Sequence, residues 1–180
     1  MDNLIAGEEA RRAGAGAADR MTGIVVVSGN PRPGSRTSAL AIAVGEAFAA
    51  RLGAPAPTVI EVGDLGAGLL TKGDEATAAA VAALIGADLL VVATPTYKGS
   101  YTGLLKVLLD QLPNQGLAGR TAVPVVTAGI APQAAAAEAL LRQLLGELGA
   151  DVVRPGLPVV EADLPETAAI AQKYAAAADL

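Results

Sequence analysis

The sequence predicts an α/β domain in which a parallel sheet is covered by helices on both faces. Short β-branched runs alternate with helical patterns along residues 24–178. The runs are apolar throughout, which is typical of strands buried on both faces. The chain has 180 residues, the length of one ordinary domain, and 52% of them are hydrophobic.

The first strand is predicted at residues 24–28 (IVVVS), a β-branched run that ends at Gly29. Residues 38–52 carry apolar side chains every four positions and predict a helix with Gly53 as its C-cap. A second strand follows at residues 57–62. The chain thus begins with one strand–helix–strand unit, as a parallel sheet requires.

The middle of the chain repeats this alternation. Residues 74–85 are rich in Ala and predict a helix that Gly86 closes. Residues 88–93 (DLLVVA) predict a buried third strand. Residues 101–112 predict a helix with its leucines directed inward, and Pro113 ends it.

Two more strand–helix pairs complete the pattern. Residues 121–127 predict a fourth strand, although Pro124 is unusual in a central strand. A helix with a leucine face is predicted at residues 132–148. A fifth strand within residues 151–160 is interrupted by two prolines. Residues 163–166 (DLPE) resemble a capping box that opens the last helix.

Five strands in so short a chain favour the strand order 2-1-3-4-5 of a flavodoxin-like three-layer sandwich over the Rossmann order. In this order the topology reverses between the first and third strands, and a ligand is expected beyond their carboxyl ends. The loops after these two strands, residues 29–38 and 94–103, are the most polar and the richest in Gly and Pro. We therefore expect the functional site where the two loops meet.

The composition excludes several kinds of site. The chain has no Cys and no His, which excludes disulfides, thiol nucleophiles, Cys- or His-ligated metals and a Ser-His-Asp triad. The net charge of −5, from 13 basic and 18 acidic residues, disfavours nucleic acid as a partner. No apolar run approaches the roughly 20 residues of a membrane span. An enzyme of this composition is expected to rely on a cofactor for its chemistry.

Residues 1–20 are rich in Ala, Gly and charge and show no sustained apolar period. Arg11 and Arg12 are followed by a segment too short and too weakly apolar for a twin-Arg signal. We therefore expect a disordered extension at residues 1–20, a domain at residues 21–180 and a cytoplasmic location.

The first polar loop suits a phosphate group. Its glycines allow the backbone to approach a ligand, and its hydroxyl groups stand at a predicted helix start, which favours an anion. Arg32 and Arg36 add the capacity for charge-assisted hydrogen bonds. The alternative is plain N-capping by Ser35 or Thr37, with both arginines in solvent. A P-loop fits worse, since Ser35-Arg36 stand where Lys-Ser/Thr is required, and G-x-G-x-x-G is absent.

The second polar loop suits a flat aromatic ligand. Pro95 restricts the chain, and Tyr97 and Tyr101 are two of only four aromatic residues in the protein. The alternative is that both tyrosines merely cover the edge of the sheet. Lys106 and Asp110 stand four residues apart on the following helix, a spacing that suits an exposed ion pair on the helix surface.

Both loops resemble the signatures of one family. Residues 28–38 (SGNPRPGSRTS) resemble the phosphate loop of NAD(P)H-dependent FMN reductases, and residues 93–113 (ATPTYKGSYTGLLKVLLDQLP) resemble the family's second signature. The most similar branch is the flavin reductases that supply two-component alkanesulfonate monooxygenases. The resemblance implies an oxidoreductase that reduces FMN with NADPH or NADH, acts on small-molecule substrates and has a flavin-dependent monooxygenase as partner.

The resemblance also implies which residues form the site, and no catalytic side chain among them, because the flavin carries the chemistry. The FMN phosphate would be held by Asn30, Arg32, Ser35, Thr37 and Ser38. The isoalloxazine would be lined by Pro95, Thr96, Tyr97 and Lys98, with Thr127, Ala128 and Gly129 at its other side. A homodimer or homotetramer is implied as well, and the apolar circumference of the helix at residues 101–112 independently predicts an oligomer.

Two other functions remain open. One is an FMN-dependent quinone or azo reductase, and the other is an electron carrier of flavodoxin type without NAD(P)H oxidase activity. The carrier fits less well, because such carriers usually hold FMN between bulky aromatic side chains, whereas only 2% of this chain is aromatic. Oxidation of NADPH in the presence of free FMN distinguishes an enzyme from a carrier.

Overall fold

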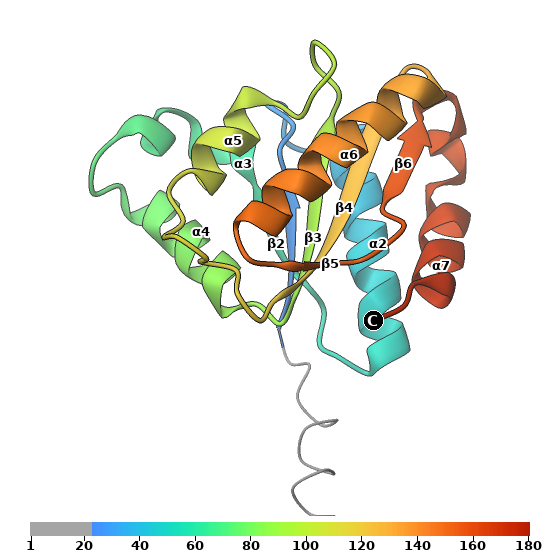
Figure 1. Ribbon diagram of the computed structural model, residues 1–180, viewed down its shortest axis with the longest axis horizontal. Helices are drawn as coiled ribbons and strands as arrows, with labels where there is room; N and C mark the ends of the chain where they lie inside the picture. Colours follow the sequence, from blue (N-terminus) through green and yellow to red (C-terminus); the bar gives the residue numbers. More distant parts are fainter. Residues whose placement is uncertain (1–22) are drawn as a thin grey trace, which may run out of the picture.

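Figure 1 shows the protein as a computed structural model, which describes residues 23–180. The extension predicted at residues 1–20 lies outside these described residues. The strands are β1 (Ile24–Ser28), β2 (Thr58–Glu61), β3 (Leu89–Pro95), β4 (Thr121–Ala128), β5 (Asp151–Val152) and β6 (Leu157–Val160). They form one parallel sheet in the order β2-β1-β3-β4-β5, and β6 also pairs with β4. The predicted strand order is thereby confirmed.

Helices cover both faces of this sheet and make the fold a three-layer sandwich (Figure 1). The helices are α2 (Arg36–Leu52), α3 (Val62–Leu65), α4 (Glu75–Gly86), α5 (Gly103–Leu109), α6 (Ala131–Glu147) and α7 (Thr167–Ala177), with 3-10 helices η1 (Gly66–Leu70) and η2 (Glu161–Glu166). The first core layer contains α2 and α7, and the second contains α3 to α6. No helix within residues 23–180 is long and apolar enough to cross a membrane.

Alternate residues of the central strands β1, β3 and β4 face the two core layers. Val26 belongs to the layer with Phe48 of α2, whereas Val27 belongs to the layer with Leu105 of α5. Both faces of the strand are therefore apolar, which explains why the strand runs show no polar alternation. The ring of Phe48 also meets Tyr174 of α7 edge-on, with centroids 6.1 Å apart, and so joins the two helices of the first layer.

The fifth strand predicted within residues 151–160 is two short strands separated by residues 153–156. The N–H of Val153 donates to the carbonyl of Ala122, so even-numbered residues of β4 direct their backbone groups toward β5 and β6. Pro124 faces the same way, at a position between the β5 and β6 pairings. Its missing N–H therefore falls where no strand offers an acceptor, and proline is tolerated in this strand.

The predicted capping box at residues 163–166 is wrong. This segment lies within η2, and α7 begins only at Thr167, with no side-chain cap at Glu166. The Thr167 hydroxyl instead donates to the Leu164 carbonyl at 2.7 Å. The 3-10 helix η2 begins immediately after β6 and already includes Asp163. Asp163 therefore does not stand at the N-terminus of α7 and cannot cap it.

Candidate functional site

A pocket of about 400 Å³ lies at the carboxyl ends of β1, β3 and β4, where the two polar loops meet. It is lined by Asn30, Arg32, Pro33, Gly34, Ser35, Arg36, Thr37, Pro95, Tyr97, Thr127, Glu161 and Leu164. A larger pocket, of about 940 Å³, lies at the opposite end of β4 beside Thr121. Because ligands of such sheets bind beyond the carboxyl ends at the topological switch, the smaller pocket is the candidate site.

The first turn of α2 forms one wall of the pocket. Ser35 is the N-cap of this helix, and its Oγ accepts the Ser38 N–H at 3.1 Å. Gly34 has a φ of 66°, which favours glycine and turns the chain into the helix. Capping by one hydroxyl still leaves other first-turn N–H groups without an intrahelical acceptor. The capping interpretation and the anion interpretation of this loop are therefore compatible.

The Ser38 hydroxyl lies behind this turn rather than in the pocket. It donates to Oε2 of Glu61 at 2.8 Å. It is also 2.6 Å from the Ser28 hydroxyl and 3.0 Å from the Ser35 hydroxyl, and with its own hydrogen committed it accepts from both. The other carboxylate oxygen of Glu61 accepts the Gly34 N–H at 3.1 Å. Glu61 thus fixes the loop from behind, and sequence reasoning missed it.

Thr37 and Thr127 connect the helix turn to the end of β4. Both side chains are buried, both residues line the pocket, and their hydroxyl oxygens are 2.8 Å apart. A hydroxyl pair needs only one of its two hydrogens for the mutual bond, so one O–H donor remains for a ligand.

The two arginines of the loop have different surroundings. Nη2 of Arg36 is 2.7 Å from Oε2 of Glu161, and this ion pair joins α2 to η2 across the pocket. The Arg32 backbone N–H donates to Oδ1 of buried Asn30 at 2.9 Å. The guanidinium of Arg32 has no hydrogen-bond or ion-pair partner within residues 23–180. Arg32 is therefore the arginine available to an incoming anion.

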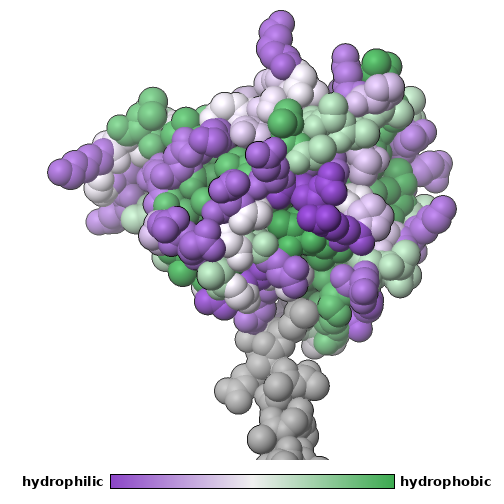
Figure 2. All heavy atoms as spheres, viewed as in Figure 1, coloured by the Kyte–Doolittle hydropathy of each residue, from purple (hydrophilic) through white to green (hydrophobic). Residues whose placement is uncertain are grey.

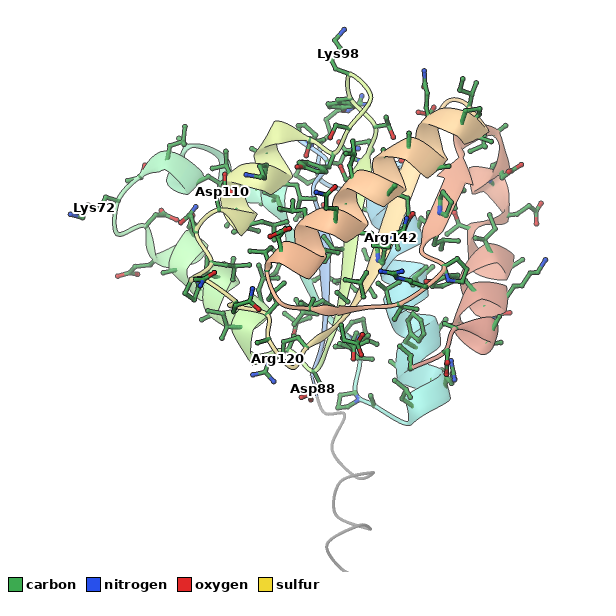
Figure 3. All side chains as sticks on the ribbon, viewed as in Figure 1. Lys72, Asp88, Lys98, Asp110, Arg120 and Arg142 are labelled. Carbon is green, nitrogen blue, oxygen red and sulfur yellow. The ribbon has the colours of Figure 1, made fainter. Side chains whose placement is uncertain are left out.

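The second loop is a tight hairpin that continues β3. Tyr97 and Ser100 exchange backbone hydrogen bonds of 2.9 and 3.2 Å, and the two residues between them have positive φ values, 53° for Lys98 and 81° for Gly99. Two such residues form a type I′ turn. Figure 3 shows the Lys98 side chain directed away from the domain at the tip of this hairpin. Tyr97, at the base, is 45% exposed and lines the pocket.

A buried hydrogen-bond relay holds the two loops together. The Thr102 hydroxyl donates to the Gly29 carbonyl at 2.6 Å and accepts the Leu105 N–H as the N-cap of α5. The Thr102 N–H in turn donates to the Thr94 hydroxyl at 3.1 Å. A Cβ at Gly29 would lie 2.7 Å from that of Leu105, so only glycine allows α5 to approach the first loop this closely. The loops are thereby fixed relative to each other.

The structure brings seven of the twelve predicted site residues to the pocket. These are Asn30, Arg32, Ser35, Thr37, Pro95, Tyr97 and Thr127. Ser38 and Ala128 are buried behind its wall, and Thr96, Lys98 and Gly129 do not line it. Glu161 and Leu164 line it without having been predicted. They come from η2, far along the chain, and no local pattern marks them.

The chemistry of the pocket fits the flavin that the resemblance implies. Its donors are hydroxyls, a helix N-terminus and a guanidinium, which suit a phosphate. Within the described residues, Oγ1 of Thr96 is buried without a hydrogen-bond partner and lies in the chain between two lining residues. Away from the pocket, burial, aided by the charge of Glu138, raises the pKa of Tyr174 to about 12. The arrangement favours binding and placement over acid–base catalysis.

Known proteins share this sequence pattern and fold. The sequence profile described as NADPH-dependent FMN reductase matches residues 22–164. The NADH-dependent FMN reductase SfnF of Pseudomonas putida is 35% identical over 139 residues, which cover 74% of this chain and 75% of that protein. The FMN reductase (NADPH) of Escherichia coli is 41% identical over 71 residues, which span only 39% of this chain and 37% of that protein.

Among solved structures, the apo form of an NADH:FMN oxidoreductase (EMOB) is similar to this fold. It superimposes with a TM-score of 0.73 and is 34% identical in sequence. The match covers 88% of this chain and 90% of that one. The sequence comparisons and the structure comparison therefore point to the same group of FMN-reducing proteins.

Proposed function

Because this chain belongs to the NADPH-dependent FMN reductase family, we propose that it reduces FMN with electrons from NADPH or NADH. Both substrates are small molecules, and residues 21–180 are the proposed functional domain. The observation that carries the proposal is the pocket at the switch point, where the Arg32 guanidinium, buried hydroxyls and the first turn of α2 converge.

The phosphate of FMN is proposed to bind at the first turn of α2. Arg32 offers a guanidinium without a partner among residues 23–180, and Ser35 and Thr37 line the same wall. Asn30 shapes the loop by accepting the Arg32 N–H, and Ser38 supports the turn from behind through its bond to Glu61. Charge-assisted hydrogen bonds of this kind are stronger than neutral ones and would anchor one end of the ligand.

The ring system is proposed to lie between the second loop and the end of β4. The residues proposed for it are Pro95, Thr96, Tyr97 and Lys98 on one side and Thr127, Ala128 and Gly129 on the other. Of these, Pro95, Tyr97 and Thr127 line the pocket, and Lys98 would contribute its backbone, since its side chain is directed away from the domain (Figure 3). The half-exposed ring of Tyr97 supplies a flat surface, and the nicotinamide is proposed to stack on the other face of the flavin ring. When bound, FMN accepts a hydride from the nicotinamide. The protein's part is placement of the two reactants.

We also propose that reduced flavin passes to a flavin-dependent monooxygenase and that the reaction takes place in the cytoplasm, where NAD(P)H is available. A homodimer or homotetramer is proposed as the working form. Leu70 is 82% exposed and Leu140 is 43% exposed, so both η1 and α6 present apolar side chains. Figure 2 shows hydrophobic and hydrophilic residues intermixed on the face that carries α6.

The test is the oxidation of NADPH and of NADH, followed by absorbance with and without free FMN. We expect sustained oxidation that requires flavin. An electron carrier would give none, whatever flavin is added. Oxidation that depends on a quinone or an azo dye, with no turnover of free FMN, would favour the other reductase class and contradict this proposal.

A further inference from the structure

We infer that Glu161 weakens the binding of phosphate-bearing flavin by competing with the phosphate for Arg36. The inference rests on the proposed function, because it assumes that the FMN phosphate binds at the first turn of α2. It assigns to Glu161 the control of flavin affinity and flavin release, a role that no local sequence pattern indicates.

The geometry places a carboxylate where an anionic ligand would be expected to bind. Glu161 is the first residue of η2, directly after β6, and its Oε2 lies 2.7 Å from Nη2 of Arg36. Both residues line the pocket. Their side chains remain 48% and 67% exposed, respectively. An exposed ion pair contributes little to stability, so an incoming phosphate can displace it at small cost.

Two effects of Glu161 oppose phosphate binding. The first is direct repulsion, because a phosphate monoester carries close to two negative charges at neutral pH. The second is competition, since the carboxylate holds a guanidinium that would otherwise donate to the phosphate. Riboflavin carries no phosphate, so neither effect applies to it. Neutralising Glu161 is therefore expected to change the affinity for FMN without changing the affinity for riboflavin.

Glu61 shows what a structural carboxylate looks like at the same loop. Both of its oxygens accept hydrogen bonds, from the Gly34 N–H and the Ser38 hydroxyl, and it does not line the pocket. Glu161 contacts only the Arg36 side chain by hydrogen bond or ion pair within residues 23–180. Glu161 can therefore be neutralised without dismantling the loop.

The experiment measures dissociation constants of FMN and riboflavin by quenching of flavin fluorescence in Glu161→Gln. We expect FMN to bind about two- to fivefold more tightly, the upper range for releasing one exposed charge interaction, and to dissociate correspondingly more slowly. Riboflavin affinity should stay unchanged. In the Arg36→Ala background the gain should be smaller, because no guanidinium is released. Glu166→Gln is the matched control: it removes the same charge from η2 at an exposed position outside the pocket.

The outcomes separate the inference from the proposed function. Wild-type protein that binds FMN no more tightly than riboflavin would contradict the phosphate site itself. A clear FMN preference that Glu161→Gln leaves unchanged would overturn only the role of Glu161. Equal gains for both flavins, or the same gain in Glu166→Gln, would also overturn it, because they would indicate packing or overall charge instead.

Discussion

Arg32 and Arg36 stand four residues apart in one loop, and only the surroundings distinguish them. The Arg36 guanidinium is paired with Glu161, whereas that of Arg32 is free within the described part of the chain. From the sequence, both arginines have the capacity to bind an anion, with both in solvent as the alternative, and the family resemblance assigned the phosphate to Arg32. The ion pair could not be predicted, because Glu161 is 125 residues away and becomes a neighbour only once β6 pairs with β4.

We predict that Arg32→Ala weakens FMN binding about 10- to 150-fold, the equivalent of about 1.5 to 3 kcal/mol for a hydrogen bond to a charged group. Arg36→Ala should cost less, since its guanidinium is already held by a carboxylate. Titration of both variants with FMN and riboflavin measures this. A larger loss in Arg36→Ala than in Arg32→Ala would reverse the two assignments.

We predict that Lys98→Ala lowers the rate of NAD(P)H oxidation about tenfold or less, because the side chain is directed away from the domain and the protein's role is placement (Figure 3). Tyr97→Phe should retain activity likewise, since the ring surface remains. Steady-state kinetics with saturating FMN tests both. Abolished flavin reduction in a variant that still binds FMN would require a chemical role for that side chain.

At the scale of elements, Thr102 fixes the position of the first loop relative to the second. We predict that Thr102→Val destabilises the domain by about 2 to 3 kcal/mol, since it removes a helix cap and leaves the buried Gly29 carbonyl without its donor. Urea unfolding measures the change. Thr71→Val, which removes an exposed hydroxyl bonded to the Ala67 carbonyl, is the control and should stay within about 0.5 kcal/mol of wild type. Equal losses in the two variants would contradict the relay.

The N-cap of α4, Asp74, predicts that the stability of the fold depends on pH. The Thr77 N–H donates to the Asp74 carboxylate at 2.8 Å and lowers the pKa of this group from its ordinary value of 3.8. Because the pKa is lower in the folded state, the ionised carboxylate stabilises the fold fully above pH 3.8. This stabilisation is lost as the pH falls through the folded-state pKa. We therefore expect Asp74→Ala to be less stable than wild type at neutral pH.

The gap between Asp74→Ala and wild type should narrow as the solution is acidified below the ordinary pKa of the carboxyl. Urea unfolding at neutral and at acid pH tests this. Exposed Glu46 of α2 makes no such bond within the described residues, so Glu46→Ala serves as the control. A gap that is independent of pH would contradict the capping role.

Element types and order could be predicted from the sequence, because apolar runs and capping glycines are local signals. Element ends and interruptions could not. The split of the last strand depends on its pairing with β4 around Pro124, and α3 and η1 lie in a segment without a periodic pattern. The position of the pocket could be predicted as well, because the strand order places the two polar loops together. Its wall from η2 could not, because Glu161 and Leu164 reach the pocket only through the tertiary fold.

At the scale of the whole molecule, the apolar circumference of the helix predicted at residues 101–112 is less exposed than its sequence indicates. Leu105, Leu108, Leu109 and Leu112 are buried within the domain, and only Leu104 and Val107 are partly exposed. Leu70 of η1, an element in contact with α5, is 82% exposed. We therefore expect the predicted oligomer to use η1 and α6 as well as α5.

We predict that light scattering at micromolar concentration shows at least a dimer. Leu70→Glu and Leu140→Glu place a charge on η1 and on α6, respectively, and the variant that lowers the observed mass identifies the face used. Val59→Glu, on the edge strand β2, is the control and should keep the wild-type mass. A monomeric wild-type protein would refute the prediction.

The interruption beside Pro124 shortens the strands along one edge of the sheet, and strand length at an edge affects the tendency to aggregate. Exposed strand edges with long rows of unpaired backbone groups recruit other chains into shared sheets. Here one edge of the sheet is β2, with four residues, and the other is divided into strands of two and four residues. Neither edge offers a long template, so strands of separate molecules have little to pair with. The predicted association between copies is therefore expected to use helices rather than strand edges.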